Sequence, residues 1–274
     1  MDFYMREAFV TAGLQGKPGR ILRPRIAFTV EKTEDSFTNK ATISLWNLNG
    51  ESRAVLEEKK TVIRLDAGYK NNPSLLFIGQ TNLDTVGMVK TTRQGPDIIT
   101  TVEAGDGELN LTNAHLEVSL GPGATNRQVF EALVKSIGIA LAVGVKKDFP
   151  VVQYGKGFSY AGRAKDLMDR LMKDVDYRWS IQNNEIQVTP RLRGTGEEAA
   201  YITPQTGLIN IPSKTDEGFT FESVLDPRIT PGRLVTVESG ITGKGVFRVV
   251  KSVHVGDTHE GEWKTTFEGV PRGQ

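Results

Sequence analysis

The chain contains no cysteine among its 274 residues, and it contains only three histidines. The first absence excludes disulfides, thiolate nucleophiles and cysteine-ligated metal sites. The histidines, His115, His254 and His259, lack the His-x-x-x-His and His-Glu-x-x-His spacings that hold zinc on a helix. We therefore predict no metal site and no cofactor.

Long hydrophobic runs are also missing. The longest, residues 137–145, contains two glycines and is far shorter than the ~20 residues of a membrane-spanning helix. Asp2, Arg6 and Glu7 interrupt any signal-peptide core. The formal net charge of +1 gives no general attraction to nucleic acid. We expect a globular protein of two or three domains that is made in the cytoplasm and has no membrane anchor.

Familiar catalytic patterns are incomplete. In residues 157–162 the second glycine comes one position too late for a Gly-x-Ser-x-Gly elbow around Ser159. Residues 121–126 place Asn126 where a dinucleotide fingerprint has its third glycine, and residues 243–245 lack the upstream glycine of a P-loop. All three segments are interpreted as turns or the entry to a helix.

The carboxylates and tryptophans do not indicate chemistry either. Asp166 and Asp169 are three apart on a predicted helix, which is typical of a solvated face. Asp106 and Glu108 follow a glycine but lack the alternation of a calcium loop. The three tryptophans at 46, 179 and 263 are interpreted as core or interface anchors. We predict that the protein is not an enzyme.

What the chain does have is a distant internal repeat. Residues 62–68 (Val-Ile-Arg-Leu-Asp-Ala-Gly) match residues 234–240 (Leu-Val-Thr-Val-Glu-Ser-Gly) position by position. Each copy follows an alternating stretch, at 41–45 and 219–223, and each block closes on Thr-Thr-x-Glu, at 100–103 and 265–268. The repeat predicts two similar β modules in one subunit, through which a small oligomer presents twice its own symmetry.

The first block, residues 1–108, is predicted to be the first β-barrel domain. Residues 1–24 contain several glycines and prolines and are interpreted as an arm or irregular strand. A short helix is expected at 52–59 with Ser52 as its N-cap. Alternating apolar residues predict strands, which fall at 26–30, 39–48, 62–67, 75–79, 81–86 and 98–103.

The middle block, residues 109–176, is predicted to be a small α+β insert. Thr125 and Gln128 form a capping-box pattern at the start of one helix, and Gly138 suits its end. A second helix follows with an apolar stripe from Ala164 to Met172. Short strands are expected at 140–145 and 151–152.

The last block, residues 177–274, is predicted to be the second β-barrel domain. It begins with a hairpin that turns at Asn183-Asn184, because asparagine tolerates positive φ. A polar loop, 191–200, precedes the repeat partner at 203–269. The fold class is thus mainly β, with two related β-barrel domains flanking a small α/β domain.

Spaced motifs along the chain resemble phage baseplate hub proteins. Residues 39–49, Ser52-Arg53, 67–69 and 76–79 look like the first domain of that family. Residues 203–209, 231–235 and 254–258, ending at Trp263, are similar to its later part. The resemblance implies two tail-tube-like barrels per subunit and a homotrimer that forms a pseudo-sixfold ring. It is shared with the N-terminal part of type VI secretion spikes.

The resemblance also implies partners and a place. The ring would dock on a hexameric tail tube protein above and a trimeric spike below, among other baseplate proteins, in the tail baseplate of the virion. Because the sequence stops after the second module, we expect the spike to be a separate protein. DNA or a tape-measure protein would pass through the ring.

Two hairpins, at 81–103 and 247–267, are the candidates to line the bore. Strict alternation places Val249, Val253 and Val255 on one face of the second hairpin's first strand. Its other face carries Arg248, Ser252 and His254. We assign this polar face to the lumen, where a passing polymer should slide without sticking.

Two other functions compete with this hypothesis. A carbohydrate-binding β-module of a tail or cell-surface protein would explain the tryptophans and the strands, but not two separated copies with a helical insert. A glycosidase acting on cell wall would need two carboxylates that converge in space. The sequence alone does not exclude either.

Overall fold

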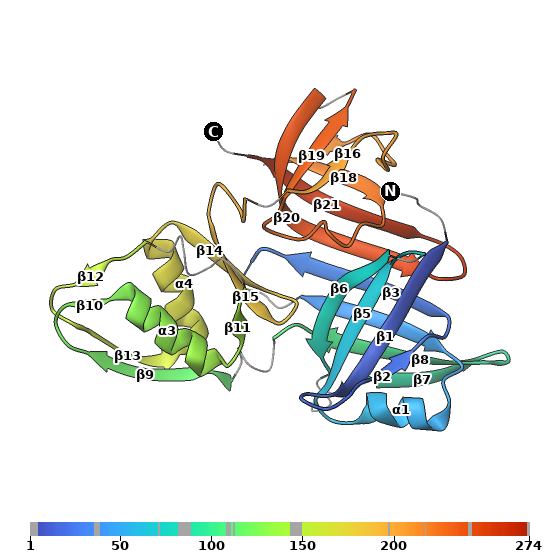
Figure 1. Cartoon of the computed structure of the whole chain (residues 1–274), viewed down its shortest axis with the longest axis horizontal. Coiled ribbons are helices and arrows are strands. Elements are labelled where there is room, and N and C mark those ends of the chain that lie inside the picture. The colour runs from blue at the N-terminus through green and yellow to red at the C-terminus, as the bar shows by residue number, and fades with distance from the viewer. Residues whose placement is uncertain are drawn as a thin grey trace.

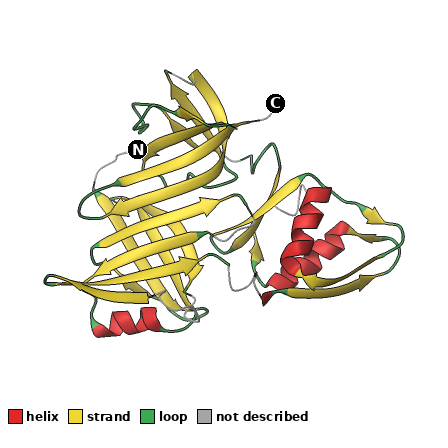
Figure 2. Cartoon of the chain, turned by 180° about the vertical axis from the view of Figure 1, so that it is seen from behind, coloured by secondary structure: helices red, strands yellow, loops and turns green. Residues whose placement is uncertain are grey.

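The chain is mainly β, with an α+β insert between two β modules (Figures 1 and 2). The computed structural model describes residues 5–35, 39–70, 72–81, 89–107, 111, 113–142, 150–196, 198–216, 218–240 and 243–272. The first module contains β1 (Arg6–Leu14), β2 (Arg20–Leu22), β3 (Ile26–Thr33), β4 (Lys40–Trp46), α1 (Gly50–Glu57), β5 (Thr61–Tyr69), β6 (Asn72–Gln80), β7 (Val89–Gln94) and β8 (Asp97–Gly105).

The other elements follow in chain order. The insert contains β9 (His115–Leu120), β10 (Ala124–Thr125), α3 (Asn126–Ile137), β11 (Ala140–Leu141), β12 (Gln153–Tyr154), β13 (Phe158–Arg163), α4 (Ala164–Asp174), β14 (Tyr177–Gln182) and β15 (Glu185–Pro190). The second module contains β16 (Glu198–Ile202), β17 (Ser213–Lys214), β18 (Phe219–Val224), β19 (Leu234–Ser239), β20 (Gly243–Asp257) and β21 (Trp263–Pro271).

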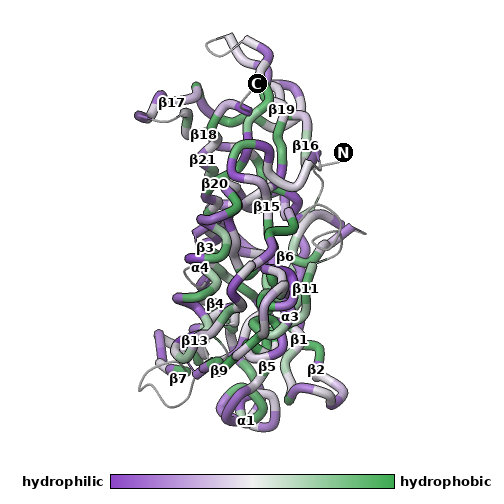
Figure 3. Tube along the Cα trace, turned by 90° about the vertical axis from the view of Figure 1, so that its left-hand side faces the viewer, coloured by the Kyte–Doolittle hydropathy of each residue, from purple (hydrophilic) through white to green (hydrophobic). Residues whose placement is uncertain are grey.

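One large sheet joins the two β modules. We call its continuous part, β17-β18-β21-β20-β3-β4-β8-β7, the strand row. The labels of β17, β18, β21, β20, β3 and β4 follow one another down one side of the molecule in Figure 3, with β7 further down. Strands β6, β5, β1 and β2 continue from β8, while β19 and β16 continue from the first half of β20. No pairing among the described residues joins β2 back to β3, so closure of the predicted barrel stays a prediction.

Each module buries its own apolar core. The first core collects inward-facing side chains of β1, β3, β4, β5, β6 and β8, such as Phe28, Ile43 and Phe77. The second module has a core rich in phenylalanine. The insert packs the amphipathic faces of α3 and α4 together. The first core also contains Leu225 and Trp263 of the last block. The division of the chain into three domains stays a prediction.

The insert shows both confirmed helix ends and one shifted boundary. The capping box of Thr125 and Gln128 is present, and Gly138 ends α3 with φ of 72°. The hairpin β14–β15 lies next in sequence to the second module, but its Trp179 and Ile181 belong to the core of the insert. A division drawn from the cores therefore falls near Pro190, whereas the boundaries predicted from sequence, 108 and 176, stay a prediction.

The N-terminal segment differs from the prediction. Instead of an arm or an irregular strand, β1 is a regular strand that pairs with β5 over nine residues, from Arg6↔Tyr69 to Leu14↔Thr61. The glycines of this segment serve its turn and its close contacts, for example Gly16 with φ of 79°. Helix α1 begins earlier than predicted, because the side chain of Asn49, not Ser52, caps it by accepting from the Ser52 amide. Most of the strand predicted at 81–86 lies outside the described residues.

Candidate functional site: the seam between the two β modules

The predicted repeat is confirmed at the level of strand register. In the first module, Thr42 of β4 stands opposite Glu103 of β8, and Ile43 opposite Val102. In the second, β18 and β21 place Thr220 opposite Glu268, and Phe221 opposite Phe267. The two Thr-Thr-x-Glu motifs thus occupy the same ladder position in both modules.

Equivalence extends along the whole strand row. Since β4 corresponds to β18 and β8 to β21, their outer neighbours also correspond, β3 to β17 and β7 to the second half of β20. The row therefore consists of two quartets in the same order, β17-β18-β21-β20 and then β3-β4-β8-β7. The quartets meet head to tail where β20 pairs with β3.

We call the pairing of β20 with β3 the seam. It consists of seven antiparallel register pairs, from Lys251↔Thr33 to Asp257↔Ala27. Gly256 is one of the paired residues of the seam, and its lack of a side chain leaves room for the rings of Phe28 and Trp263. These rings meet edge to face with centroids 5.5 Å apart. Trp263 of the second module thus packs into the core of the first module.

An ion pair secures each end of the seam. At one end Arg25 Nη2 lies 2.8 Å from Asp257 Oδ2 and 2.5 Å from Glu260 Oε1. At the other end Glu34 pairs with Arg248, and both side chains are buried. A second arginine, Arg178 of the insert, lies 3.5 Å from the same carboxylate oxygen of Glu34. The buried end of the seam is therefore where all three parts of the chain meet.

The lumen assignment of Arg248, Ser252 and His254 is corrected by their burial. Arg248 is only 4% exposed, and Ser252 and His254 are completely buried. The pairing with β21 shifts register between Val249 and Lys251. One extra residue in a strand reverses which face the following side chains occupy. Ser252 and His254 therefore point inward, while Val253 and Val255 remain half-exposed on the outer face.

A polar layer lies beneath the seam. His254 Nδ1 lies 2.9 Å from Thr265 Oγ1, and burial together with the nearby Lys32 ammonium lowers the pKa of His254 to about 3. Burial also lowers the pKa of Lys32 to about 8, against the attraction of Asp106. The histidine is neutral at neutral pH, which suits a buried structural position.

Asp106 fastens the insert to the first module. Its two carboxylate oxygens accept hydrogen bonds from the backbone amides of Asn183 and Asn184, at 2.7 and 2.6 Å. These asparagines form the predicted β14–β15 turn and have φ of 55° and 63°. Lys32 Nζ donates to Asn183 Oδ1 at 2.9 Å. Burial raises the pKa of Asp106 to about 6. Its sequence partner Glu108 lies outside the described residues.

The outer face of the strand row is exposed around the seam. Hydroxyl side chains dominate it in the first quartet, where Ser44 Oγ lies 3.0 Å from Thr101 Oγ1. Charges of both signs face each other across strands, as in Glu31↔Lys40 and Lys251↔Glu268. A shallow hollow of about 330 Å³ lies here, lined by Thr29, Thr42, Ser44 and Val255 among others.

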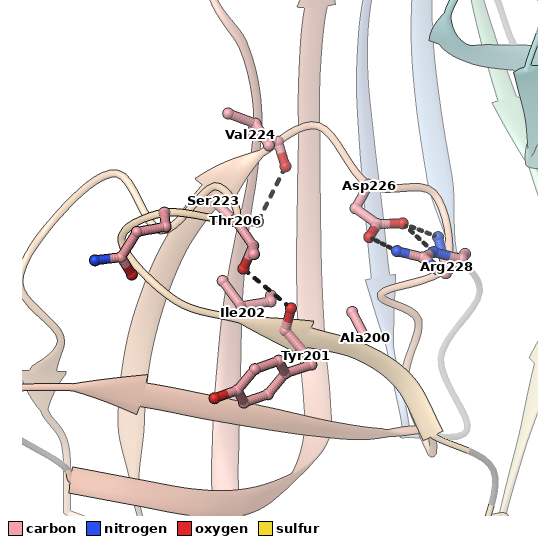
Figure 4. Close-up of a pocket in the computed structure, with 9 residues that line it drawn as sticks. Ala200, Tyr201, Ile202, Thr206, Ser223, Val224, Asp226 and Arg228 are labelled. Carbon is pink, nitrogen blue, oxygen red and sulfur yellow. Dashed lines mark hydrogen bonds and ion pairs between the residues drawn. The ribbon is translucent and has the colours of Figure 1, made fainter. Parts of the chain in front are cut away.

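A separate cavity of about 400 Å³ lies in the second module (Figure 4). Asp226 binds Arg228 at its rim, with Oδ1–Nε and Oδ2–Nη2 distances of 2.9 and 2.7 Å. The Ser223 hydroxyl donates to the carbonyl oxygen of Val224 at 3.1 Å, and Thr206 Oγ1 donates to that of Tyr201 at 3.2 Å. The cavity is lined by one carboxylate and by no histidine, so its lining shows no nucleophile–base pair.

The tryptophans do not form a sugar platform. Trp179 and Trp263 are 4% and 7% exposed, which confirms their interpretation as core anchors. Trp179 Nε1 donates to Asp169 Oδ1 at 2.7 Å. The guanidinium of Arg25 lies over Trp46, 4.6 Å from the ring centroid. A sugar-binding aromatic must present an open face. Trp179 and Trp263 are buried, and Arg25 lies over one face of the partly buried Trp46.

Within the described residues, no group of three or more His, Cys, Asp or Glu side chains is arranged to hold a metal ion. No helix in the same part of the chain combines the length and the apolar character needed to cross a membrane.

Comparison with known proteins identifies the family. The family model described as baseplate hub gp41 matches residues 16–244, which is most of the chain. The chain belongs to the baseplate hub gp41 family. It is a structural protein of the phage tail, and its place is the tail baseplate of the virion. No curated protein sequence matches it.

Solved structures support the fold of this baseplate hub protein. It is similar to the 43 kDa tail protein of prophage MuSo2 from Shewanella oneidensis, with 10% identity, a TM-score of 0.66, and coverage of 97% of this chain and 98% of that one. A tail protein from Neisseria meningitidis MC58 gives 9% identity and a TM-score of 0.67, covering 98% and 97%. The E. coli type VI secretion component c3393 gives 9% identity and a TM-score of 0.60, covering 96% and 77%.

Sequence reasoning missed the residues that hold the baseplate hub together. Glu34, Lys32 and Asp106 are buried polar residues whose partners lie more than sixty positions away. The one available signal was the position of Asp106 directly after Gly105, which closes the first copy of the repeated Thr-Thr-x-Glu motif.

Proposed function

We propose that three copies of this chain form a closed ring with pseudo-sixfold symmetry, and that this ring adapts a sixfold tail tube to a threefold spike while leaving a channel for DNA. The observation that carries the proposal is the head-to-tail order of the two quartets in one strand row. Three chains, each with two equivalent quartets, present six equivalent positions around one axis.

The seam supports ring formation by its type of contact. It joins the β20 edge of one quartet to the β3 edge of the next, so the two surfaces in contact differ. Contacts of this heterologous kind generate rings when the rotation between units closes. The same contact repeated between chains would extend the row without a new kind of interface.

We assign the bore to the outer face of the strand row. We propose this face in place of Arg248, Ser252 and His254, because these three side chains are buried within the chain. It presents hydroxyls such as Thr29, Thr42 and Thr266 with charges of both signs, and the half-exposed Val253 and Val255 are short. Such a surface offers a passing polyanion neither a basic patch nor large apolar anchors.

The partners follow from the same symmetry. A tail tube protein would contact one end of the ring, and a spike protein with other baseplate proteins would contact the other. The similar E. coli protein is described as a type VI secretion component that resembles T4 tail proteins gp27 and gp5. That description supports a hub that works next to a spike.

The decisive experiment measures assembly. Purified full-length chain, alone and mixed with its tail tube protein, is examined by light scattering and by two-dimensional electron-microscopy classes. We expect a three-chain torus with a sixfold outline, formed at the latest when the tube protein is present. A protein that stays monomeric in both conditions, or assembles with twofold symmetry, would overturn the proposal.

The bore assignment has its own test in assembled phage. Arginine at the outer-face positions Thr42 and Thr266 should keep the ring intact and slow DNA delivery, because the passing backbone would bind the new charges. Lys59→Arg, in the exposed turn that follows α1, is the control. Normal delivery by the Thr42→Arg, Thr266→Arg double variant would place the bore elsewhere.

A further inference from the structure

Within the part of the chain that the structure describes, two strand edges of the row have no partner. Among the described residues, β7 pairs only with β8, and β17 pairs only with β18. Five of the six residues of β7 are exposed. Beside β17, Ile211 is 77% exposed, which is the highest value among the exposed large hydrophobic residues. Free edges of this kind pair readily with another strand.

The internal repeat indicates which strands pair with these two edges. By the register of each quartet, β7 corresponds to the second half of β20, and β17 corresponds to β3. Inside the chain those two counterparts pair with each other at the seam. The geometry points to a second copy of this chain as the occupant: β7 of one copy pairs antiparallel with β17 of the next, reproducing the seam between molecules. This inference rests on the proposed ring.

The register of the new pairing follows from three ladders. Ile99 of β8 and Lys264 of β21 occupy equivalent positions in the two quartets. Thr92 pairs with Ile99, and Val255 pairs with Lys264, so Thr92 is equivalent to Val255. Thr220 of β18 and Thr42 of β4 are also equivalent. Ser213 pairs with Thr220, and Thr29 pairs with Thr42, so Ser213 is equivalent to Thr29.

Val255 pairs with Thr29 at the seam. The equivalent pair between copies is therefore Thr92 with Ser213. One step along, Thr91 faces Lys214, as His254 faces Val30.

The contact between copies lacks two features of the internal seam. Gln94 stands at the position of Asp257. Gly207 stands at the position of Arg25, because the Val224 amide bonds to the Gly207 carbonyl as the Trp46 amide bonds to that of Arg25. The ion pair at that end therefore has no counterpart. Pro212 stands where Phe28 does, and proline cannot donate to a ladder. The pairing between copies is expected to be weaker than the seam, and association should depend on concentration or on the tube protein.

Engineered cysteines test the register, because the natural chain has none to interfere. Chain with Thr92→Cys is mixed with chain carrying Ser213→Cys, with the tube protein present, and oxidised. Opposed strand residues lie within disulfide range. We expect a disulfide-linked dimer from the mixture and none from either variant alone. The chain with both changes should give dimers and closed trimers.

The seam itself supplies the matched control. Thr29→Cys with Val255→Cys in one chain is the internal equivalent of the tested pair, and it should close a disulfide within the monomer. If this control closes and rings form, yet Thr92 and Ser213 do not link, the edge assignment is wrong while the proposed ring stands. If no ring forms at all, the proposed function itself fails.

A charge variant provides a second readout that needs no oxidation. Thr92→Glu combined with Ser213→Glu places like charges opposite each other between copies, and we expect at least a tenfold loss of ring formation. Thr92→Lys with Ser213→Glu should restore it. Equal assembly of both variants would overturn the pairing.

Discussion

The two quartets of the strand row share order and register but differ in what fills their inner sides. The first quartet packs mostly aliphatic residues such as Val30, Ile43 and Leu45. In the second, Phe221 stacks on Phe267 with ring centroids 5.0 Å apart and meets Phe247 at 4.9 Å. The two quartets therefore share their strand pairing and register. They differ in the side chains that form their cores, which are mostly aliphatic in the first and aromatic in the second.

A second difference concerns continuity. In the first module β6 and β7 are separate strands, whereas in the second the single strand β20 performs both roles. The bulge at Val250 lets β20 leave β19 and join β3. The hairpin registers differ accordingly, because Phe77 faces Leu65 while Phe247 faces Val235, two positions apart in the repeat. An even offset keeps both phenylalanines on the inner side.

Replacing His254 with threonine, the residue at the equivalent position 91, should give the largest change in the free energy of unfolding among the tests of this comparison. The pKa of His254 falls from 6.5 to about 3 on folding. Between these values the unfolded chain binds a proton here and the folded chain does not, so stability is lost as pH falls from 6.5 towards 3. The loss corresponds to roughly 4–5 kcal/mol at pH 3.

The His254→Thr variant should lack this loss. Urea unfolding of both proteins at several pH values between 3 and 7 measures the difference between them. His259→Thr, on an exposed turn, is the control and should follow the wild-type profile. Parallel profiles of wild type and His254→Thr would show that the histidine is not held neutral.

Truncating the equivalent core residues Phe221 and Ile43 compares the two fillings directly. Phe221→Ala should cost about 3–5 kcal/mol, and Ile43→Ala about 2–5 kcal/mol. We expect Phe221→Ala to be the more damaging, because it also removes the two ring contacts. Chemical denaturation followed by tryptophan fluorescence measures both. A larger loss for Ile43→Ala would mean that the aromatic core can collapse around the gap.

Asp106 predicts a pH response opposite in sign to that of His254. Its pKa rises from 3.8 to about 6 on folding. Between these values the folded chain holds more protons, so this contribution to stability is full below 3.8 and is lost as pH rises through 6. It amounts to roughly 3 kcal/mol. Asp106→Asn should remove the dependence in thermal unfolding, and the exposed Asp216→Asn should not.

The smallest effect tests the register equivalence on the exposed face. Double-mutant cycles on Thr42 with Glu103 and on Thr220 with Glu268 should each give a coupling of about 0.2–1 kcal/mol, as directly opposed strand residues do. A third cycle on Thr42 with Glu268, which lie in different quartets, should give none. Coupling in only one quartet would show that the two ladders are not energetically alike.

The sequence was sufficient for the features that depend on local pattern. Alternation and the Thr-Thr-x-Glu motifs predicted both modules, and capping residues predicted α3. Pairing of β20 with β3 could not be predicted, because it joins segments more than two hundred residues apart. The faces of β20 were wrong for a local reason: one extra residue at Val250 reverses the alternation, and no residue type there marks a bulge. Asp106 was visible only as a loop carboxylate, since its amide partners come from the insert.

The paired arginine and carboxylate contacts at the ends of the seam have a mechanical consequence. A pull along β20 loads its seven pairs with β3 together, whereas a pull across it must open them one after another from an end. The ion pairs Arg25–Asp257 and Glu34–Arg248 stabilise the two ends at which this opening would begin. The seam inside each chain should therefore resist a higher force than the β7–β17 pairing between chains. A ring under mechanical load should separate into intact subunits.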